Sequence, residues 1–168
     1  MIDIKNIENF VQAYITKNFK EPISVPILMP AMGPPISIVI KDPDEIDFIK
    51  LRAQELSETF SEMLLRLIKE SGQKNSTIYN RANIDRRHFS KIATQKEYQP
   101  SKQTVLAFAI ALKLDFEKTQ DLLAVAGFTL SKANLADVIV SFFIEYKIFD
   151  VDLVNQILYK YNQPLLGG

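Results

Sequence analysis

The chain has 168 residues, its 20 Lys and Arg balance its 20 Asp and Glu, and it contains no cysteine. This length suits one hydrophobic core with a small appendage, and the absence of cysteine excludes a disulfide-stabilised scaffold. No apolar run reaches the about 20 residues that a membrane-spanning helix needs, and the acid at Asp3 is untypical of a secretory signal. We therefore expect a cytoplasmic protein that contacts no membrane.

Residues 1–41 are predicted to form a helix followed by an extended arm. Apolar residues recur at helical spacing from Ile4 to Ile15, which predicts an amphipathic helix over residues 3–18. Residues 21–43 contain six prolines, which exclude a helix, and two stretches rich in strand-forming residues. Because two strands alone are marginal in water, we expect the arm to lie against the helical body or against another chain.

A second domain is predicted over residues 42–130, and it begins with a long helix. Apolar residues step by three and four from Ile46 to Leu67, which gives a heptad seam that ends at Gly72. Two interpretations stay open. Either the seam pairs two chains through residues 43–71, or the helix bends near residues 57–59 and packs both halves inside one monomer.

Shorter helices are predicted beyond this seam, and the last two form a C-terminal extension over residues 131–168. Ser131 and Asp150 are the predicted caps of these last two helices. The predicted short helices span residues 76–82, 85–94, 101–112, 116–126, 132–146 and 151–161. Since everything outside the arm is predicted to be helical, the expected fold class is all-α, a multi-helix globule.

The basic residues of the chain gather in one segment. Residues 72–104 carry seven Lys and Arg against two acids, a net charge of +5. Residues 1–60 carry six against nine, and residues 105–168 carry five against seven. A phosphate backbone is the candidate partner for such a segment.

Apolar spacing in the basic segment predicts two short helices that cross at a tight turn. Ile78 and Ala82 share a face of the first helix, one turn apart. Phe89 and Ile92 share a face of the second helix, and Ile84 lies where the turn must tuck one side chain inward. We expect all five side chains to be buried.

Polar residues complete this turn and form an outward face. Asn83 tolerates the left-handed conformation that the turn requires, and Asp85 can cap the second helix. With the apolar side buried, the residues left outside are Arg86, Arg87, Ser90, Lys91 and Thr94. A helix with such a face fits the major groove of DNA, where arginine can bind guanine edges through two hydrogen bonds.

Residues 60–123 resemble the lambda-repressor-like helix-turn-helix domain of phage repressors and bacterial regulators. The resemblance lies in the helix from Phe60 to Ser71, in the pair just described, and in the stretch YQPSKQTVLAFAIALKLDFEKTQDLL, residues 98–123. It implies five helices, of which the second of the pair reads DNA. The implied base-facing residues are Arg86, Arg87, Ser90 and Lys91, and the implied backbone contacts are Lys74, Lys96 and Lys102.

Two positions depart from that family's pattern. Tyr79 stands where the family usually has alanine, and Asn83 stands where it usually has glycine. A tyrosine does not fit a gap made for a methyl group, so either the crossing angle of the two helices is altered or the ring escapes to the side.

Two functions remain open on this sequence. One is a DNA-binding transcriptional regulator that reads the major groove with residues 85–94, as a possible homodimer through residues 43–71, the arm or the C-terminal helices. The alternative is a non-enzymatic protein–protein interaction module that keeps the helix-turn-helix fold without binding DNA. His88, the one histidine, is interpreted as a surface side chain, and no catalytic residue, metal or cofactor is predicted.

Overall fold

The computed structural model describes residues 4–21, 58–95 and 98–168. The chain divides into one compact unit made of Met1–Glu21 with Glu58–Gly168, and a second made of Pro22–Ser57. The second unit lies outside the described residues, and with it the predicted arm and most of the predicted long helix. The predicted C-terminal extension belongs to the same compact unit as the predicted helix-turn-helix pair.

The described residues form eight helices and no strand, which confirms the all-α fold class. None of these helices is long and apolar enough to cross a membrane. Their bounds are α1 Ile4–Asn18, α3 Phe60–Glu70, α4 Asn75–Arg81, α5 Arg86–Thr94, α6 Lys102–Ala111, α7 Phe116–Val125, α8 Leu135–Glu145 and α9 Val151–Lys160. Each predicted short helix is therefore present within a few residues of its expected bounds.

Helix α3 begins at a capping box. Thr59 has an extended backbone, its hydroxyl accepts a hydrogen bond from the amide of Glu62, and the Glu62 carboxylate accepts one from the Thr59 amide. A helix that runs without interruption through Thr59 into α3 is therefore excluded. The sequence T-F-S-E already carries this signal. Residues 43–57 of the predicted seam lie outside the described residues, so both interpretations of the seam stay predictions.

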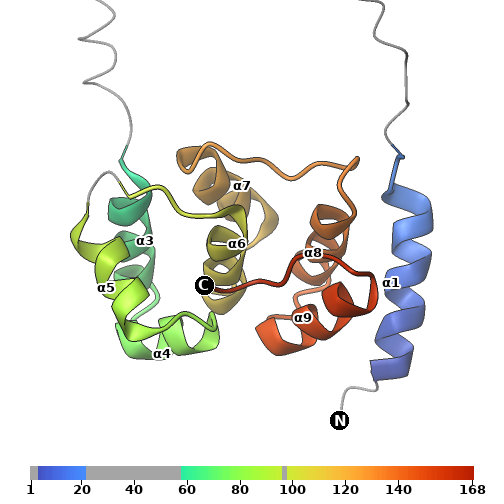
Figure 1. Ribbon diagram of the computed structural model, residues 1–168, viewed down its shortest axis with the longest axis horizontal. Coiled ribbons are helices and arrows are strands. Elements are labelled where there is room, and N and C mark those ends of the chain that lie inside the picture. The colour runs from blue at the N-terminus through green and yellow to red at the C-terminus, as the bar shows by residue number, and fades with distance from the viewer. Residues whose placement is uncertain (1–3, 22–57, 96–97) are drawn as a thin grey trace, which may run out of the picture. The chain divides into compact units, whose positions relative to one another are not determined.

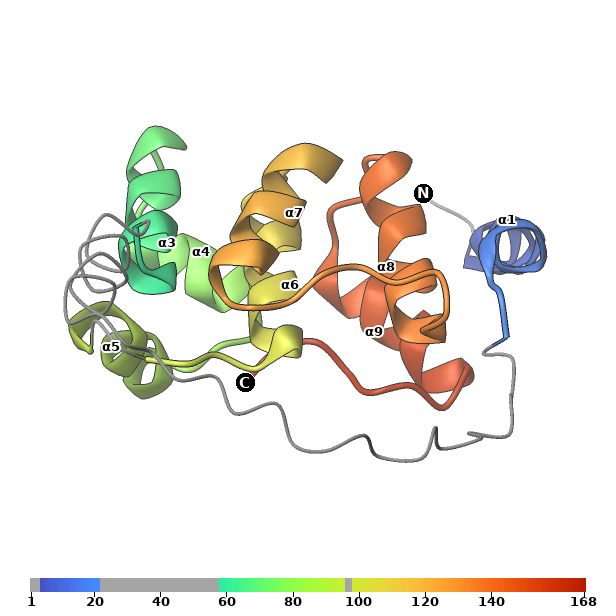
Figure 2. The same cartoon turned by 90° about the horizontal axis from the view of Figure 1, so that it is seen from above.

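The helices succeed one another across the unit (Figures 1 and 2). Helix α5 contacts α3 and α4 at one end, α4 packs against α6, and α6 and α7 pack together in the middle. Helix α9 packs against α6, α8 packs against α7 and α9, and α1 covers α8 at the other end. Helix α5 thus lies at the end of the unit remote from the C-terminal helices.

Helix α6 is the centre of this arrangement because it has neighbours on three sides. Every residue from Thr104 to Ala111 is buried, and Phe108 is among the largest side chains that are wholly enclosed. A helix that is apolar all round is stable in water only where other elements cover it, here α4, α7 and α9. Helix α4, and α5 that packs against it, are positioned through this contact with α6.

Two connections in the unit share one three-residue turn, in which a left-handed residue is followed by a buried aliphatic residue and a capping aspartate. Asn83 after α4 and Lys113 after α6 both have positive φ, 54° and 57°. In each turn the amide of the next residue donates a hydrogen bond to the carbonyl five residues earlier. Ile84 donates to Tyr79 at 2.9 Å, and Leu114 donates to Ala109 at 3.0 Å. This is the Schellman arrangement, in which a left-handed residue ends a helix and an apolar residue follows it into the core. The predicted turn at Asn83 is confirmed.

The start of α8 differs from its prediction. The cap is Asn134, whose side chain accepts from the amide of Asp137, and not Ser131. The Ser131 hydroxyl instead accepts a hydrogen bond from the amide of Ala133, which closes a local turn ahead of the helix. The predicted cap Asp150 of α9 is confirmed, since its carboxylate accepts from the amide of Leu153.

Helix α1 has the partner surface that its amphipathic pattern requires. Ile7, Val11 and Ile15 are buried, and α1 contacts α8. The ring of Tyr14 packs edge-on against Phe142 of α8, with 5.4 Å between the ring centroids. Because an isolated helix of 15 residues is only marginally stable in water, the stability of α1 depends on this contact.

Candidate functional site

Helix α5 is held at its first turn by the cap that the sequence predicts. The Oδ1 atom of Asp85 accepts hydrogen bonds from the amides of Arg87 at 2.7 Å and His88 at 2.9 Å. These hydrogen bonds, the one from the His88 amide above all, lower the pKa of the Asp85 carboxyl below its usual value. A carboxylate at this position also opposes the positive end of the helix dipole.

The inner side of α5 is anchored as expected. Phe89 and Ile92 are buried, and so are Ile78, Ala82 and Ile84 of the preceding helix and turn. The Phe89 ring lies 5.2 Å from the ring of Tyr79 and 6.2 Å from that of Phe108, measured between centroids. The five predicted core residues are confirmed, and they fix which face of α5 points outward.

The tyrosine that departs from the family pattern lies to the side of the pair. Tyr79 is half-buried, and its ring packs against the ring of Phe89. Of the two expectations for this residue, the ring that escapes to the side agrees with the structure. It widens the apolar base on which α5 rests.

The outer side of α5 consists of the five predicted polar residues, and all of them are exposed. These residues are Arg86, Arg87, Ser90, Lys91 and Thr94. Within the described part of the chain, neither Arg86 nor Arg87 forms a hydrogen bond or an ion pair with another side chain. The Lys91 ammonium lies 5.7 Å from the ring centroid of Tyr98, and the Thr94 hydroxyl bonds the Ser90 carbonyl. The face therefore presents three positive charges that this part of the protein does not neutralise.

The three lysines expected to flank this face have different environments. Lys74 is exposed at the start of α4. Lys96 lies outside the described residues. Lys102 is not free, because its ammonium lies 2.6 Å from Asp137 Oδ2 and 2.6 Å from the Thr129 carbonyl oxygen.

The expected phosphate contact by Lys102 disagrees with this geometry. Asp137 is only 2% exposed, and a buried carboxylate that lost its cation would remain unpaired at a large cost in free energy. The same Oδ2 atom accepts a hydrogen bond from the Ser131 amide, so the pair ties α6 to the loop before α8. Sequence reasoning missed this pair, although a lone acid in the apolar run of α8 is a signal that a partner is needed.

The histidine of α5 is not the surface side chain that the sequence suggested. His88 is half-buried, and its Nε2 atom lies 2.7 Å from the hydroxyl oxygen of Tyr98. This contact joins α5 to the loop that leads to α6. It places His88 on the flank of α5, where Tyr98 also lies near Lys91.

The last residues of the chain pack against the same flank. Leu166 is buried and exchanges two hydrogen bonds with the side chain of Asn155, and the Gly167 carbonyl accepts from the Thr104 hydroxyl at 3.2 Å. A methyl group at Gly168 would lie 2.2 Å from His88 Nδ1, so only glycine fits there without movement of the ring. The exposed face of α5 stays uncovered by this segment.

The described residues contain no group of three or more histidine, aspartate or glutamate side chains that would hold a metal ion. Comparison with known proteins gives no further assignment. No family model matches the chain, and neither a curated protein nor a solved structure is similar to it. The functional argument therefore rests on the geometry and charge of α5 and its surroundings.

Proposed function

We propose that the protein binds double-stranded DNA and places α5 in the major groove, as a transcriptional regulator of the lambda-repressor-like kind. The observation that carries the proposal is the exposed, unneutralised face of α5 above a buried apolar base. Arg86 and Arg87 are suited to guanine edges, and Ser90, Lys91 and Thr94 are suited to bases or phosphates.

The turn before α5 supports this use of the helix. The Schellman turn at Asn83 and the anchors Phe89 and Ile92 set the direction of α5 independently of its outer residues. A recognition surface needs such preorganisation, because side chains on a rigid helix reach base edges without loss of backbone freedom on binding.

Charge also supports the proposal. The net charge of +5 over residues 72–104 contrasts with −3 over residues 1–60 and −2 over residues 105–168. One of the seven cations, Lys102, is used by Asp137, and Arg81 donates to the Gln73 side chain. The cations on α5 and Lys74 remain available to phosphate oxygens, and such contacts release counterions from DNA.

A fluorescence anisotropy titration with a labelled duplex at several salt concentrations tests the proposal. If one subunit contacts on the order of 4 to 6 phosphates, the logarithm of the affinity falls against the logarithm of the salt concentration with a slope of about −4 to −5. A variant with Arg86, Arg87 and Lys91 all changed to alanine should lose this binding and keep its fold.

A matched control distinguishes the effect of the charges on α5 from the effect of the total charge of the protein. The variant with Lys17, Lys118 and Lys147 changed to alanine loses the same three charges from exposed positions on α1, α7 and the turn after α8. It should retain most of the duplex affinity. Equal loss in both variants, or full retention in the α5 variant, would contradict a binding surface on α5.

The alternative, an interaction module without DNA binding, is favoured by exposed aromatic side chains at the other end of the unit. Phe10 on α1 is 64% exposed, and Tyr159 on α9 is 78% exposed. Aromatic residues are enriched in protein–protein interfaces relative to the rest of the surface. Under this alternative no duplex binds at low salt, and changing Phe10 and Tyr159 to serine alters the mass measured by analytical ultracentrifugation.

A further inference from the structure

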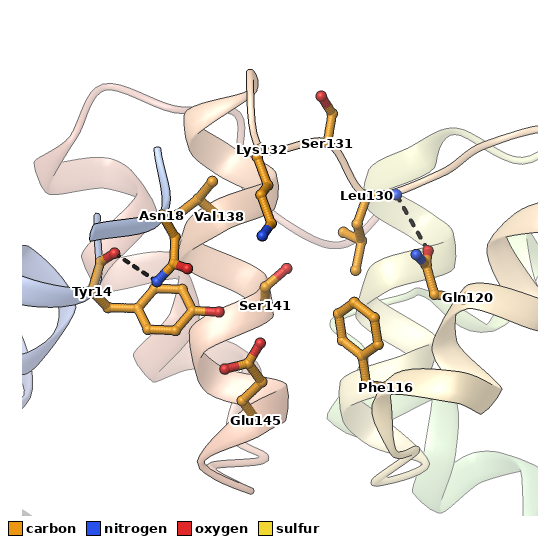
Figure 3. Close-up of a pocket in the computed structure, with 10 residues that line it drawn as sticks. All are labelled: Tyr14, Asn18, Phe116, Gln120, Leu130, Ser131, Lys132, Val138, Ser141 and Glu145. Carbon is orange, nitrogen blue, oxygen red and sulfur yellow. Dashed lines mark hydrogen bonds between the residues drawn. The ribbon is translucent and has the colours of Figure 1, made fainter. Parts of the chain in front are cut away.

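A cavity of about 230 Å³ lies between α1, α7 and α8, remote from α5 (Figure 3). Sequence reasoning assigned nothing to it. At roughly 30 Å³ for each water of the liquid, it has room for about eight water molecules or one small organic molecule. The lining residues are Tyr14, Asn18, Phe116, Gln120, Leu130, Ser131, Lys132, Val138, Ser141 and Glu145.

Hydrogen bonds around the rim of the cavity hold its walls in place. The amide of Lys20, just after α1, donates to the carbonyl of Lys132 at 3.0 Å. The amide of Leu130 donates to the side chain of Gln120 on α7 at 3.3 Å, and the amide of Ser131 donates to Asp137 at 2.9 Å. The loop that forms the rim is thus bonded to α7, to α8 and to the segment just after α1.

The base of the cavity carries a negative charge. The phenol of Tyr14 lies beside the carboxylate of Glu145, and burial above all, with the nearby negative charge of Glu145, raises the pKa of this phenol. The Tyr14 phenol therefore stays neutral beside Glu145 and has a proton to donate. A carboxylate offers more than one acceptor position, so Glu145 still has capacity for a second donor.

A positive charge lies across the same space. Figure 3 shows the side chains of Lys132 and Ser141 directed into the cavity above Glu145. Among residues 4–21, 58–95 and 98–168, no side chain or carbonyl forms a hydrogen bond or ion pair with the Lys132 ammonium or the Ser141 hydroxyl. The cavity thus contains an available cation and an available hydroxyl next to a carboxylate.

An apolar wall faces these polar groups. Phe116 of α7 and Leu130 of the rim point toward the cavity from the side opposite Tyr14 and Glu145. Phe116 is 40% exposed although it is a large apolar side chain at the start of a helix that packs in the middle of the unit. A ligand with an apolar group would cover it.

We infer that this cavity binds a small zwitterion with an apolar side chain, of the size of a free amino acid. The ammonium of the ligand pairs with Glu145, its carboxylate pairs with Lys132 and Ser141, and its apolar group lies against Phe116 and Leu130. The opposite charges of the site match a ligand of zero net charge that carries both signs. This inference does not rest on DNA binding, because every residue in it lies outside the helix-turn-helix pair.

Titration of the ¹⁵N-labelled full chain with L-leucine and with L-phenylalanine tests the inference by chemical-shift changes. The amides of Ser131, Lys132 and Ser141 should shift with saturation. Two analogues of leucine serve as matched probes: 4-methylpentanoic acid lacks the ammonium, and 3-methylbutylamine lacks the carboxylate. Each should bind at least about tenfold more weakly than leucine, because a hydrogen-bonded charge pair is lost.

Two variants with matched controls connect the binding to the named side chains. Lys132→Met and Glu145→Gln should each weaken binding of the amino acid by about tenfold or more. Lys118→Met and Glu117→Gln, exposed changes on α7 outside the cavity, should leave it unchanged. No saturable shift with either amino acid, equal affinity for the analogues, or unchanged binding in Lys132→Met would overturn the inference.

Discussion

Helices α4 and α5 are joined by the same turn as helices α6 and α7, and only the first pair presents a basic surface. The turn Asn83–Asp85 and the turn Lys113–Asp115 each consist of a left-handed residue, a buried aliphatic residue and a capping aspartate. The two second helices begin in the same way, and both pack their inner faces against the core.

The outer faces of these second helices differ in charge. The outer face of α5 carries Arg86, Arg87 and Lys91 without an acid, whereas the exposed residues of α7 include Glu117, Lys118 and Asp121. The turn therefore explains how the helices cross, and it does not distinguish a DNA-reading pair from a purely structural one. The proposed difference in function therefore rests on the chemistry of the outward face alone.

Removal of the buried aliphatic residue should damage both turns equally. Ile84→Ala and Leu114→Ala should each lower the free energy of unfolding by about 2 to 4 kcal/mol, because each leaves a cavity beneath a helix end. Urea denaturation measures the loss, and Leu165→Ala, a change at a half-exposed position, is the control with an expected loss below about 1 kcal/mol. A large loss in one turn alone would show that the two connections are not equivalent.

Substitution of two lysines of the basic segment tests which of them stabilises the fold and which contacts DNA, as proposed. Lys102→Met should lower the free energy of unfolding by roughly 2 to 3 kcal/mol, because Asp137 remains buried without its partner. Lys91→Met should leave stability within about 0.5 kcal/mol and reduce the salt slope of duplex binding by about 1. Urea denaturation and anisotropy on both variants provide the comparison. A reduced salt slope with unchanged stability in Lys102→Met would restore that residue as a phosphate contact.

The capping aspartate of α5 makes the stability of that helix depend on pH. The pKa of Asp85 is lowered in the folded state, so its contribution is present above the unfolded value of about 3.9 and is lost as the pH falls through the folded pKa. An NMR titration should show a midpoint for Asp85 below that of an unfolded chain. In Asp85→Asn the acid-dependent loss of amide protection at the start of α5 should disappear. A midpoint above about 3.9 would contradict the capping geometry.

Substitution of glycine at the two left-handed positions should change the free energy of unfolding least, and the two changes should differ. Lys113→Gly should raise the free energy of unfolding by up to about 1 kcal/mol, because lysine is strained at positive φ and glycine is not. Asn83→Gly should give no gain, since asparagine tolerates this conformation and its side chain donates to Asp152 at 2.7 Å. Thermal denaturation of both variants measures the difference. An equal gain at both positions would show that the contact with Asp152 contributes nothing.

The helix-turn-helix pair was predictable because its signals are local. Burial of Ile84 and Phe89, the left-handed Asn83 and the cap Asp85 all follow from side-chain types within a few residues. The outward face of α5 then follows from helical periodicity alone. Nothing beyond the segment itself was needed.

Contacts between distant residues were not predictable in the same way. The pairing of Lys102 with Asp137, 35 residues apart, converts an expected binding cation into a structural one. The same holds for the flank of α5, where Tyr98 bonds His88, and for the cavity that α1 closes against α8. The spacing of apolar residues predicts that one face of a helix is buried, but it does not indicate which other element covers that face.

Chemical-shift mapping on the labelled full chain tests the central claim most directly. A duplex added at low salt should shift the signals of α5 most strongly, namely those of Arg86, Arg87, Ser90, Lys91 and Thr94. The signals of Glu117 and Asp121, which are exposed on the structurally equivalent helix α7, should not shift. Shifts confined to α7 or to α1 and α9, with α5 unmoved, would contradict a DNA-reading surface on α5.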